Sequence, residues 1–183
     1  MRSSASSGST VGAYRRVARF MTVVAVLSDT HIRRGGSRRL PDAVYAELDR
    51  ADLILHAGDV VVCEVLDELR GFAPVRAVLG NNDHELFGVL PDVWVGDVHG
   101  VRIGMVHDSG PSAGRAGRMR RKFPDSDVVV FGHSHIPWDD AGLDGQVLFN
   151  PGSPTDRRAQ PHHTMGLLVI EDCQLVSRTL LVV

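Results

Sequence analysis

The sequence has two cysteines, a single lysine, little aromatic content and no long apolar run. Cys63 and Cys173 lie far apart and form no C-x-x-C pair, which argues against a disulfide framework and against a thiolate metal site. The longest apolar runs, such as 23–27 and 128–131, are far too short to cross a bilayer as helices. We therefore expect a protein of a reducing, cytoplasmic compartment, with no membrane partner.

Composition and charge narrow the class of protein further. Hydrophobic residues make up 43% of the 183 residues, which is enough for one sizeable core. Aromatic residues are only 5%, so Val, Leu, Ala and Ile must build that core, and Val favours strands. The formal net charge of -2 gives no general reason to expect nucleic acid as a partner. The composition favours a single α/β domain.

Residues 1–20 differ from the rest of the chain, because they are rich in Ser and Arg and contain no acidic residue. They lack the apolar segment of a secretory signal, although a transit peptide shows the same Arg and Ser bias. The other two interpretations are a disordered tail and a native chain that begins at Met21. We expect the folded domain to cover residues 21–183.

Short β-branched runs recur from Met21 onward, and a turn follows each of them. Helical spacing of apolar residues separates the first three runs, at 41–50 and 63–70, which predicts a parallel portion of sheet. Gly100 and Asp172 lie between later runs as in hairpins, so the sheets should be mixed. The predicted strands are 23–27, 53–55, 75–79, 93–98, 101–106, 128–131, 147–149, 165–170 and 175–182.

Side chains that could bind a metal follow directly after five of the predicted strands. They are Asp29, His31, Asp59, Asn81, His107, His133 and His135. In open α/β sheets ligands bind at the carboxyl ends of the strands, so these loops should converge on one site. Residues two apart in extended backbone point to the same side, which predicts that Asp29 acts with His31 and His133 with His135.

The seven donors are oxygen and nitrogen atoms, with no thiolate. This mixture suits Mn, Fe, Zn or Ni better than Ca or Mg alone. Seven donors are too many for one tetrahedral zinc, but they can serve two cations about 3.5–4 Å apart if one carboxylate bridges them. Each motif alone is weak, whereas five of them in order at strand ends indicate a metal centre.

The ordered motifs resemble those of the calcineurin-like metallophosphoesterases. They are Asp29-x-His31, Gly58-Asp59, Gly80-Asn81-x-Asp83, His107 and Gly132-His133-x-His135. The segment Asn150-Pro151-Gly152-Ser153 is similar to one in the small single-domain phosphodiesterase branch of that superfamily. The resemblance implies an α/β fold in which two mixed β-sheets pack as a sandwich flanked by helices, a four-layer architecture.

The resemblance also implies ligands and a reaction. The first metal would be held by Asp29, His31, Asp59 and His135, and the second by Asp59, Asn81, His107 and His133. Asp59 would bridge two divalent ions, of which manganese is the first choice and Fe, Zn or Ni the others. A hydroxide shared between the ions would then attack a phosphate diester without a side-chain nucleophile. We expect a small phosphodiester substrate, such as a nucleotide.

One motif departs from much of the superfamily, which has a histidine where this chain has Asn82. An amide cannot act as a general acid at neutral pH, so Asn82 and the nearby His84 are the catalytic positions to test. The resulting hypothesis is a phosphodiesterase for good leaving groups, unless His84 donates the proton. Asn81 and Arg157 are the candidate substrate-binding residues.

Polar residues near the predicted ligands have less specific interpretations. His56, inside an apolar run, is expected to be a core histidine or a support for a ligand. We expect Asp83 and Asp108 to fix their loops. The basic segment at 114–122 predicts a helix whose charges are either solvated or bind a nucleotide.

Three questions stay open at this point. The same metal site could serve a phosphomonoesterase or protein phosphatase. A metal-binding scaffold like the retromer subunit, which shares this fold, is the rival from another class. A homo-oligomer is also compatible with the sequence.

Overall fold

The computed structural model describes residues 21–183, so the prediction for residues 1–20 lies outside the described part of the chain. The first of its two sheets has the strand order β10-β9-β1-β2-β3. Its strands are β1 (Met21–Leu27), β2 (Leu53–His56), β3 (Val75–Ala77), β9 (Thr164–Glu171) and β10 (Gln174–Val182). The first three strands are parallel, and β9 runs antiparallel to both β1 and β10.

The second sheet has the order β4-β5-β6-β8-β7 and is also mixed. Its strands are β4 (Val93–Val98), β5 (Val101–Val106), β6 (Val128–Val130), β7 (Trp138–Ala141) and β8 (Val147–Asn150). Strands β5, β6 and β8 are parallel, whereas β4 and β7 are antiparallel edge strands.

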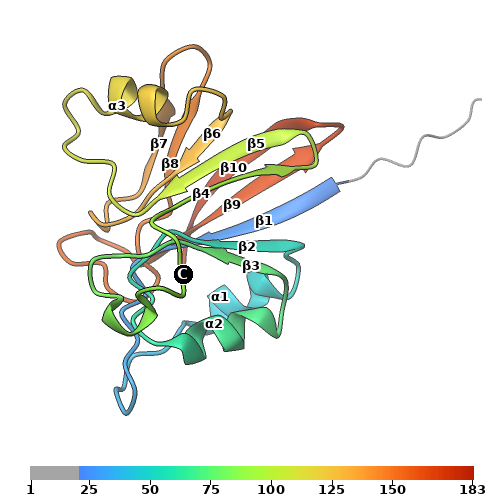
Figure 1. Cartoon of the computed structure of the whole chain (residues 1–183). Coiled ribbons are helices and arrows are strands. Elements are labelled where there is room, and N and C mark those ends of the chain that lie inside the picture. The colour runs from blue at the N-terminus through green and yellow to red at the C-terminus, as the bar shows by residue number, and fades with distance from the viewer. Residues whose placement is uncertain (1–20) are drawn as a thin grey trace, which may run out of the picture.

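Helices lie outside both sheets, which gives the four-layer α/β sandwich that was predicted (Figure 1). Helices α1 (Asp42–Leu48) and α2 (Cys63–Arg70) cover the outer face of the first sheet, and α3 (Arg115–Lys122) covers the second. A short 3-10 turn, η1, spans His84–Leu86. None of the helices within residues 21–183 is long and apolar enough to span a membrane.

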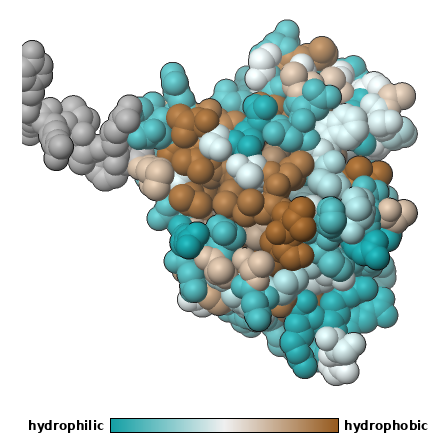
Figure 2. Space-filling model, turned by 180° about the vertical axis from the view of Figure 1, so that it is seen from behind, coloured by the Kyte–Doolittle hydropathy of each residue, from teal (hydrophilic) through white to brown (hydrophobic). Residues whose placement is uncertain are grey.

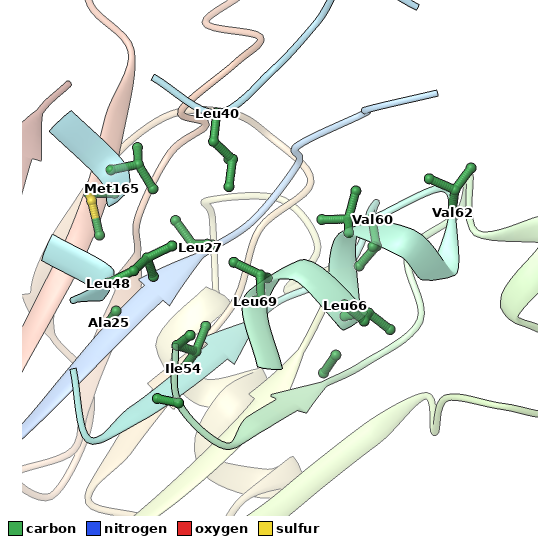
Figure 3. Close-up of a cluster of buried hydrophobic side chains, with 14 of the residues drawn as sticks. Ala25, Leu27, Leu40, Leu48, Ile54, Val60, Val62, Leu66, Leu69 and Met165 are labelled. Carbon is green, nitrogen blue, oxygen red and sulfur yellow. The ribbon is translucent and has the colours of Figure 1, made fainter. Parts of the chain in front are cut away.

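The core is divided between the two faces of the first sheet. Ala25 and Leu27 of β1 pack with α1 and α2, where Leu48 and Leu69 are fully buried (Figure 3). The alternate residues of β1, such as Val24 and Val26, pack against the second sheet instead. Because both faces of β1 are covered, its sequence is a continuous apolar run. Each fully buried Leu or Val side chain contributes roughly 1.5–3 kcal/mol, so this layer holds the site-bearing loops in place.

Three element predictions differ from the structure. Strand β7 was missed, because Asp139 and Asp140 are exposed on an edge strand and break the apolar pattern. The strand predicted at 75–79 ends at Ala77, since its partner β2 ends at His56. The helix predicted at 41–50 is shorter and begins after Pro41.

The back of the molecule in Figure 1 carries apolar side chains at its surface (Figure 2). The exposed large hydrophobic residues include Met21 of β1 and Val176 and Val182 of β10. Strand β10 is an edge strand, so it also offers unpaired backbone groups on one side. Association of the chain with further copies remains a prediction.

Candidate metal centre

The loops that carry the predicted ligands converge at one edge of the sandwich. The carboxyl ends of β1, β2 and β3 meet those of β5 and β6 there, on the left in Figure 1. An unbroken series of side-chain contacts joins all seven predicted residues. It runs from His135 to Asp29 and His31, on to Asp59, and through His107 and Asn81 to His133.

One group of donors consists of Asp29, His31 and His135. Their ligand atoms lie within 4.8 Å of one another and could hold a metal ion. Asp29 Oδ1 is 3.4 Å from His135 Nε2 and 3.9 Å from His31 Nε2. The two imidazole Nε2 atoms face each other at 3.2 Å.

A second group is built around the side-chain oxygen of Asn81. Asn81 Oδ1 is 3.0 Å from His107 Nε2 and 2.9 Å from His133 Nδ1. Asp59 lies between the two groups, because its Oδ2 is 3.4 Å from His31 Nε2 and 3.5 Å from His107 Nε2. Asp59 therefore contacts both groups. Ligand atoms of Asp29, Asp59 and His107 also lie within 4.8 Å of one another.

Two histidines are oriented so that their Nε2 atoms point toward the centre. His107 Nδ1 is 2.7 Å from the carbonyl oxygen of Ala57, and His135 Nδ1 contacts the carbonyl oxygen of Asp156. A carbonyl only accepts, so each Nδ1 carries a proton, and Nε2 is the ring nitrogen that points at the centre.

One buried acceptor atom at the centre has no hydrogen-bond donor among the described residues. His107 Nε2 faces Asn81 Oδ1, His135 Nε2 faces Asp29 Oδ1, and Asp29 Oδ1 is buried without a hydrogen-bond partner in the described chain. A buried carboxylate oxygen such as Asp29 Oδ1 is costly to leave unpaired unless a proton or a cation satisfies it. The donor set thus fits divalent cations bound by nitrogen and oxygen.

The pKa values show the competition between burial and the neighbouring charges. Burial lowers the pKa of His31 to about 4 and raises the pKa of the Asp29 carboxyl. Burial also acts to raise the pKa of Asp59, but hydrogen bonds from His107 and Asn82 outweigh it and hold that pKa below its usual range. Burial acts to lower the pKa of His107, but the hydrogen bond to Asp59 and the charge of Asp29 outweigh burial, so this pKa is raised. Asp59 is thus ionised throughout the neutral range.

The backbone at the predicted ligands is not extended, so the geometric reason behind the pairing prediction was wrong. Asp29, His31, Asp59, His133 and His135 all have positive φ, between 45° and 69°. Asp and His enter this left-handed region more readily than most residues, but each such residue still costs on the order of 1–3 kcal/mol. His133 and His135 consequently point to different groups, as the resemblance implied and the spacing did not.

Two glycines are required by the closeness of the loops. A Cβ on Gly80 would overlap the backbone nitrogen and Oδ1 of Asp59. A Cβ on Gly132 would lie 2.6 Å from Ser28 Oγ and 2.8 Å from Asp29 Oδ2. Because glycine has no Cβ, the carboxylates of Asp59 and Asp29 can lie directly against the loops of Gly80 and Gly132.

Asp83 joins the loops that follow β2 and β3, in the loop-fixing role expected for it. It is fully buried, and its carboxylate accepts backbone N–H bonds from Asp59 at 3.0 Å, Gly80 at 2.7 Å and Val61 at 2.6 Å. His56 is also fully buried, with Nε2 3.2 Å from Thr30 Oγ1. It therefore supports the loop after β1 and lies outside both donor groups.

The end of β8 and the loop after it supply supports whose roles the sequence did not indicate. Ser153 Oγ donates to the carbonyl of Asp29 at 2.7 Å, and Asn150 Nδ2 donates to the carbonyl of Gly132 at 3.0 Å. Asp156 acts on His135 through its backbone carbonyl, which any residue could provide. No sequence signal could have identified that contact.

The remaining predicted residues lie at the rim of the centre. Asn82 hydrogen-bonds Asp59, whereas His84 is exposed and packs edge-on against Phe87. Arg157 donates to the carbonyl of Gln160 in its own turn, and it is Arg158 that reaches the centre, donating to the carbonyl of His133 at 3.4 Å.

Two arginines of the basic helix predicted at 114–122 make contacts within the fold. Arg118 donates to the carbonyls of Ser109, Pro111 and Ala113, which fixes the loop after His107. Arg115 stacks over the rings of Phe131 and Trp138.

Comparisons with known proteins show the family of the chain and agree with its two-sheet fold. Residues 21–173 match the calcineurin-like phosphoesterase superfamily domain. The chain is 34% identical over 149 residues to a probable metallophosphoesterase of Methanothermobacter thermautotrophicus, covering 80% of this chain and 86% of that protein. It is 37% identical over 153 residues to a probable metallophosphoesterase of Methanocaldococcus jannaschii, covering 82% and 77%.

Among solved structures, the fold is similar to Vacuolar Protein Sorting 29 from Cryptosporidium parvum. The TM-score is 0.72 at 21% identity, and the match covers 90% of this chain and 100% of that one. The fold and donor set thus define a domain of the metallophosphoesterase type. The chain belongs to the calcineurin-like phosphoesterase superfamily, a metal-dependent family, and this membership indicates a phosphoric ester hydrolase.

Proposed function

We propose that this protein is a metal-dependent phosphodiesterase with two divalent cations at this centre. One cation would be held by Asp29, His31, Asp59 and His135, and the other by Asp59, Asn81, His107 and His133. The observation that carries the proposal is the position of Asp59 Oδ2 between His31 Nε2 and His107 Nε2, at 3.4 and 3.5 Å. Manganese is the proposed ion, since both nitrogen and oxygen donors are present.

The cations, when bound, would supply a water of lowered pKa and would offset the negative charge of the phosphate. The chain's own residues orient the donors. Asn82 and Asp83 hold the Asp59 carboxylate and the loop that carries it, while Ala57 and Asp156 fix the rings of His107 and His135. Arg158 places a guanidinium beside His133 for a phosphate oxygen at the rim.

The preference for diesters rests on Asn82. The backbone and side-chain N–H groups of Asn82 donate hydrogen bonds to Asp59. An amide cannot transfer a proton to the leaving group at neutral pH. A substrate whose leaving group needs no protonation suits such a site. Aryl and activated diesters should therefore react faster than alkyl diesters.

The test compares the manganese-loaded protein on bis(4-nitrophenyl) phosphate and on 4-nitrophenyl phosphate. We expect a higher kcat/KM on the diester and a loss of at least about a hundredfold in Asp59→Asn. His162→Ala, which changes an exposed histidine outside the seven donors, is the matched control. A preference for the monoester would favour the phosphomonoesterase alternative. A protein that binds metal but hydrolyses neither ester would favour the scaffold alternative, which the likeness in fold to Vacuolar Protein Sorting 29 fits.

A further inference from the structure

A cavity of about 380 Å³ opens directly beside the metal centre, and His31 lines it. The rest of its wall comes from the loops that follow β1 and β8. These residues are Arg33, Gly36, Ser37, Arg38 and Asp156. The cavity is of the size that holds small molecules, and it adjoins one of the two donor groups.

Two residues of the cavity wall form hydrogen bonds with histidines of the metal centre. Arg38 Nη1 donates to the carbonyl of His31 at 3.4 Å, and the carbonyl of Asp156 accepts from His135 Nδ1. Arg38 and Asp156 also form an ion pair at 3.4 Å. A group bound in the cavity would therefore be held at a fixed distance from the donor atoms of His31 and His135.

The arginines of the loop after β1 differ in how their charge is compensated. Arg34 is paired with Glu64 at 2.5 Å and with Glu85 at 2.8 Å, and it does not line the cavity. Arg33 lines the cavity and forms no ion pair with any residue from 21 to 183. Because Asp156 already pairs with Arg38, the charge of Arg33 gives the cavity an excess of one positive charge.

We infer that this cavity binds a second anionic group, a phosphate, on the substrate that the metal centre cleaves. The inference rests on the proposed function and narrows it to phosphodiesters with an additional phosphate, such as a nucleotide phosphorylated at both ends. The Arg33 guanidinium would form paired hydrogen bonds with the phosphate, and the Ser37 hydroxyl is a further donor in the same wall. Arg38 would keep its contacts with Asp156 and His31 and position the cavity.

The experiment measures binding of two product-like ligands to the manganese-treated full chain by calorimetry. The ligands are thymidine 5′-monophosphate and thymidine 3′,5′-bisphosphate, which differ by one phosphate. We expect the bisphosphate to bind about five- to tenfold more tightly to the parent. Arg33→Ala should remove that preference and leave monophosphate binding unchanged, and Arg33→Glu should reverse it. Arg39→Ala, which removes the charge of an exposed neighbour outside the cavity, should keep it.

Equal binding of the two ligands by the parent, or no binding of either, would overturn the inference. An equal loss of the bisphosphate preference in Arg33→Ala and Arg39→Ala would also overturn the inference. The preference would then come from the overall positive charge of the loop and not from binding in the cavity. Hydrolysis of bis(4-nitrophenyl) phosphate by the same preparations reports separately on the proposed function. That diester carries no second phosphate, so its turnover does not depend on the cavity.

Discussion

Asn82 holds both carboxylate oxygens of Asp59. Its backbone N–H donates to Oδ1 at 2.8 Å, and its side-chain amide donates to Oδ2 at 2.7 Å. Asn82 therefore orients the carboxylate that lies between the two donor groups. We propose that Asn82 positions this carboxylate and does not transfer a proton.

The first prediction follows from that contact. Asn82→Ala removes the side-chain bond to Oδ2 but keeps the backbone bond to Oδ1, so the Asp59 carboxylate can rotate. We expect kcat/KM on the diester and the affinity for manganese each to fall about 10- to 100-fold, which calorimetry and steady-state kinetics measure. An Asn82→Ala protein with the parent's metal affinity would show that the bond does not orient Asp59.

His84 gives the second prediction, because its ring packs against Phe87 and is exposed. We expect His84→Ala to leave the rates on bis(4-nitrophenyl) phosphate and on diphenyl phosphate unchanged. The two substrates differ in how much protonation their leaving group needs. A selective slowing on diphenyl phosphate would instead identify His84 as the proton donor.

The third prediction concerns the close approach at Gly80. The added methyl group of Gly80→Ala meets the backbone of Asp59, which must move away from its place between the donor groups. A shift of about 1 Å can cost on the order of a hundredfold in rate, and we expect that loss in kcat/KM. Gly117→Ala is the control, since a Cβ there meets only the flexible Arg121 side chain at 3.4 Å in α3. Equal activity of the two variants would contradict the account of the loop packing.

The fourth prediction is a pH effect from His56. Burial lowers the pKa of His56 from 6.5 to about 3. Above pH 6.5 both the folded and the unfolded chain leave it neutral. Below pH 6.5 the unfolded chain binds a proton that the folded chain does not, so the free energy of unfolding falls until about pH 3.

Urea unfolding of the metal-stripped protein at pH 7 and pH 5 measures this effect. His56→Leu should lose about 2 kcal/mol less between the two pH values than the parent. Changes in absolute stability cancel in that comparison. An identical pH dependence in parent and variant would show that His56 titrates equally in both states.

The resemblance of the motifs predicted the layers of the fold, and the donors at the strand ends predicted the group of seven residues. The apolar runs of β1 and β6 are buried on both faces, which makes them easy to recognise. The residues after these strands lie at one sheet edge because parallel strands end there together. Strand β7 escaped prediction, since an exposed edge strand such as Trp138–Ala141 needs no apolar alternation.

The local geometry of the centre could not be predicted in the same way. Periodicity assumes regular backbone, whereas Asp29 and His133 have left-handed φ values that only the packing of several loops sustains. His135 is oriented by a backbone carbonyl, and any residue type at position 156 would provide that carbonyl. Arg118 bonds three backbone carbonyls only because the preceding loop folds around it. The sequence alone could not show that this arginine has partners within the fold.

The most direct measurement of the central claim is anomalous diffraction from crystals of the manganese-soaked protein. The account predicts two anomalous peaks per chain on either side of Asp59 Oδ2, one next to His31 and His135 and the other next to His107 and His133. Asp59→Asn crystals treated in the same way should lose occupancy at both positions. A single peak, or peaks that do not share Asp59, would contradict the account.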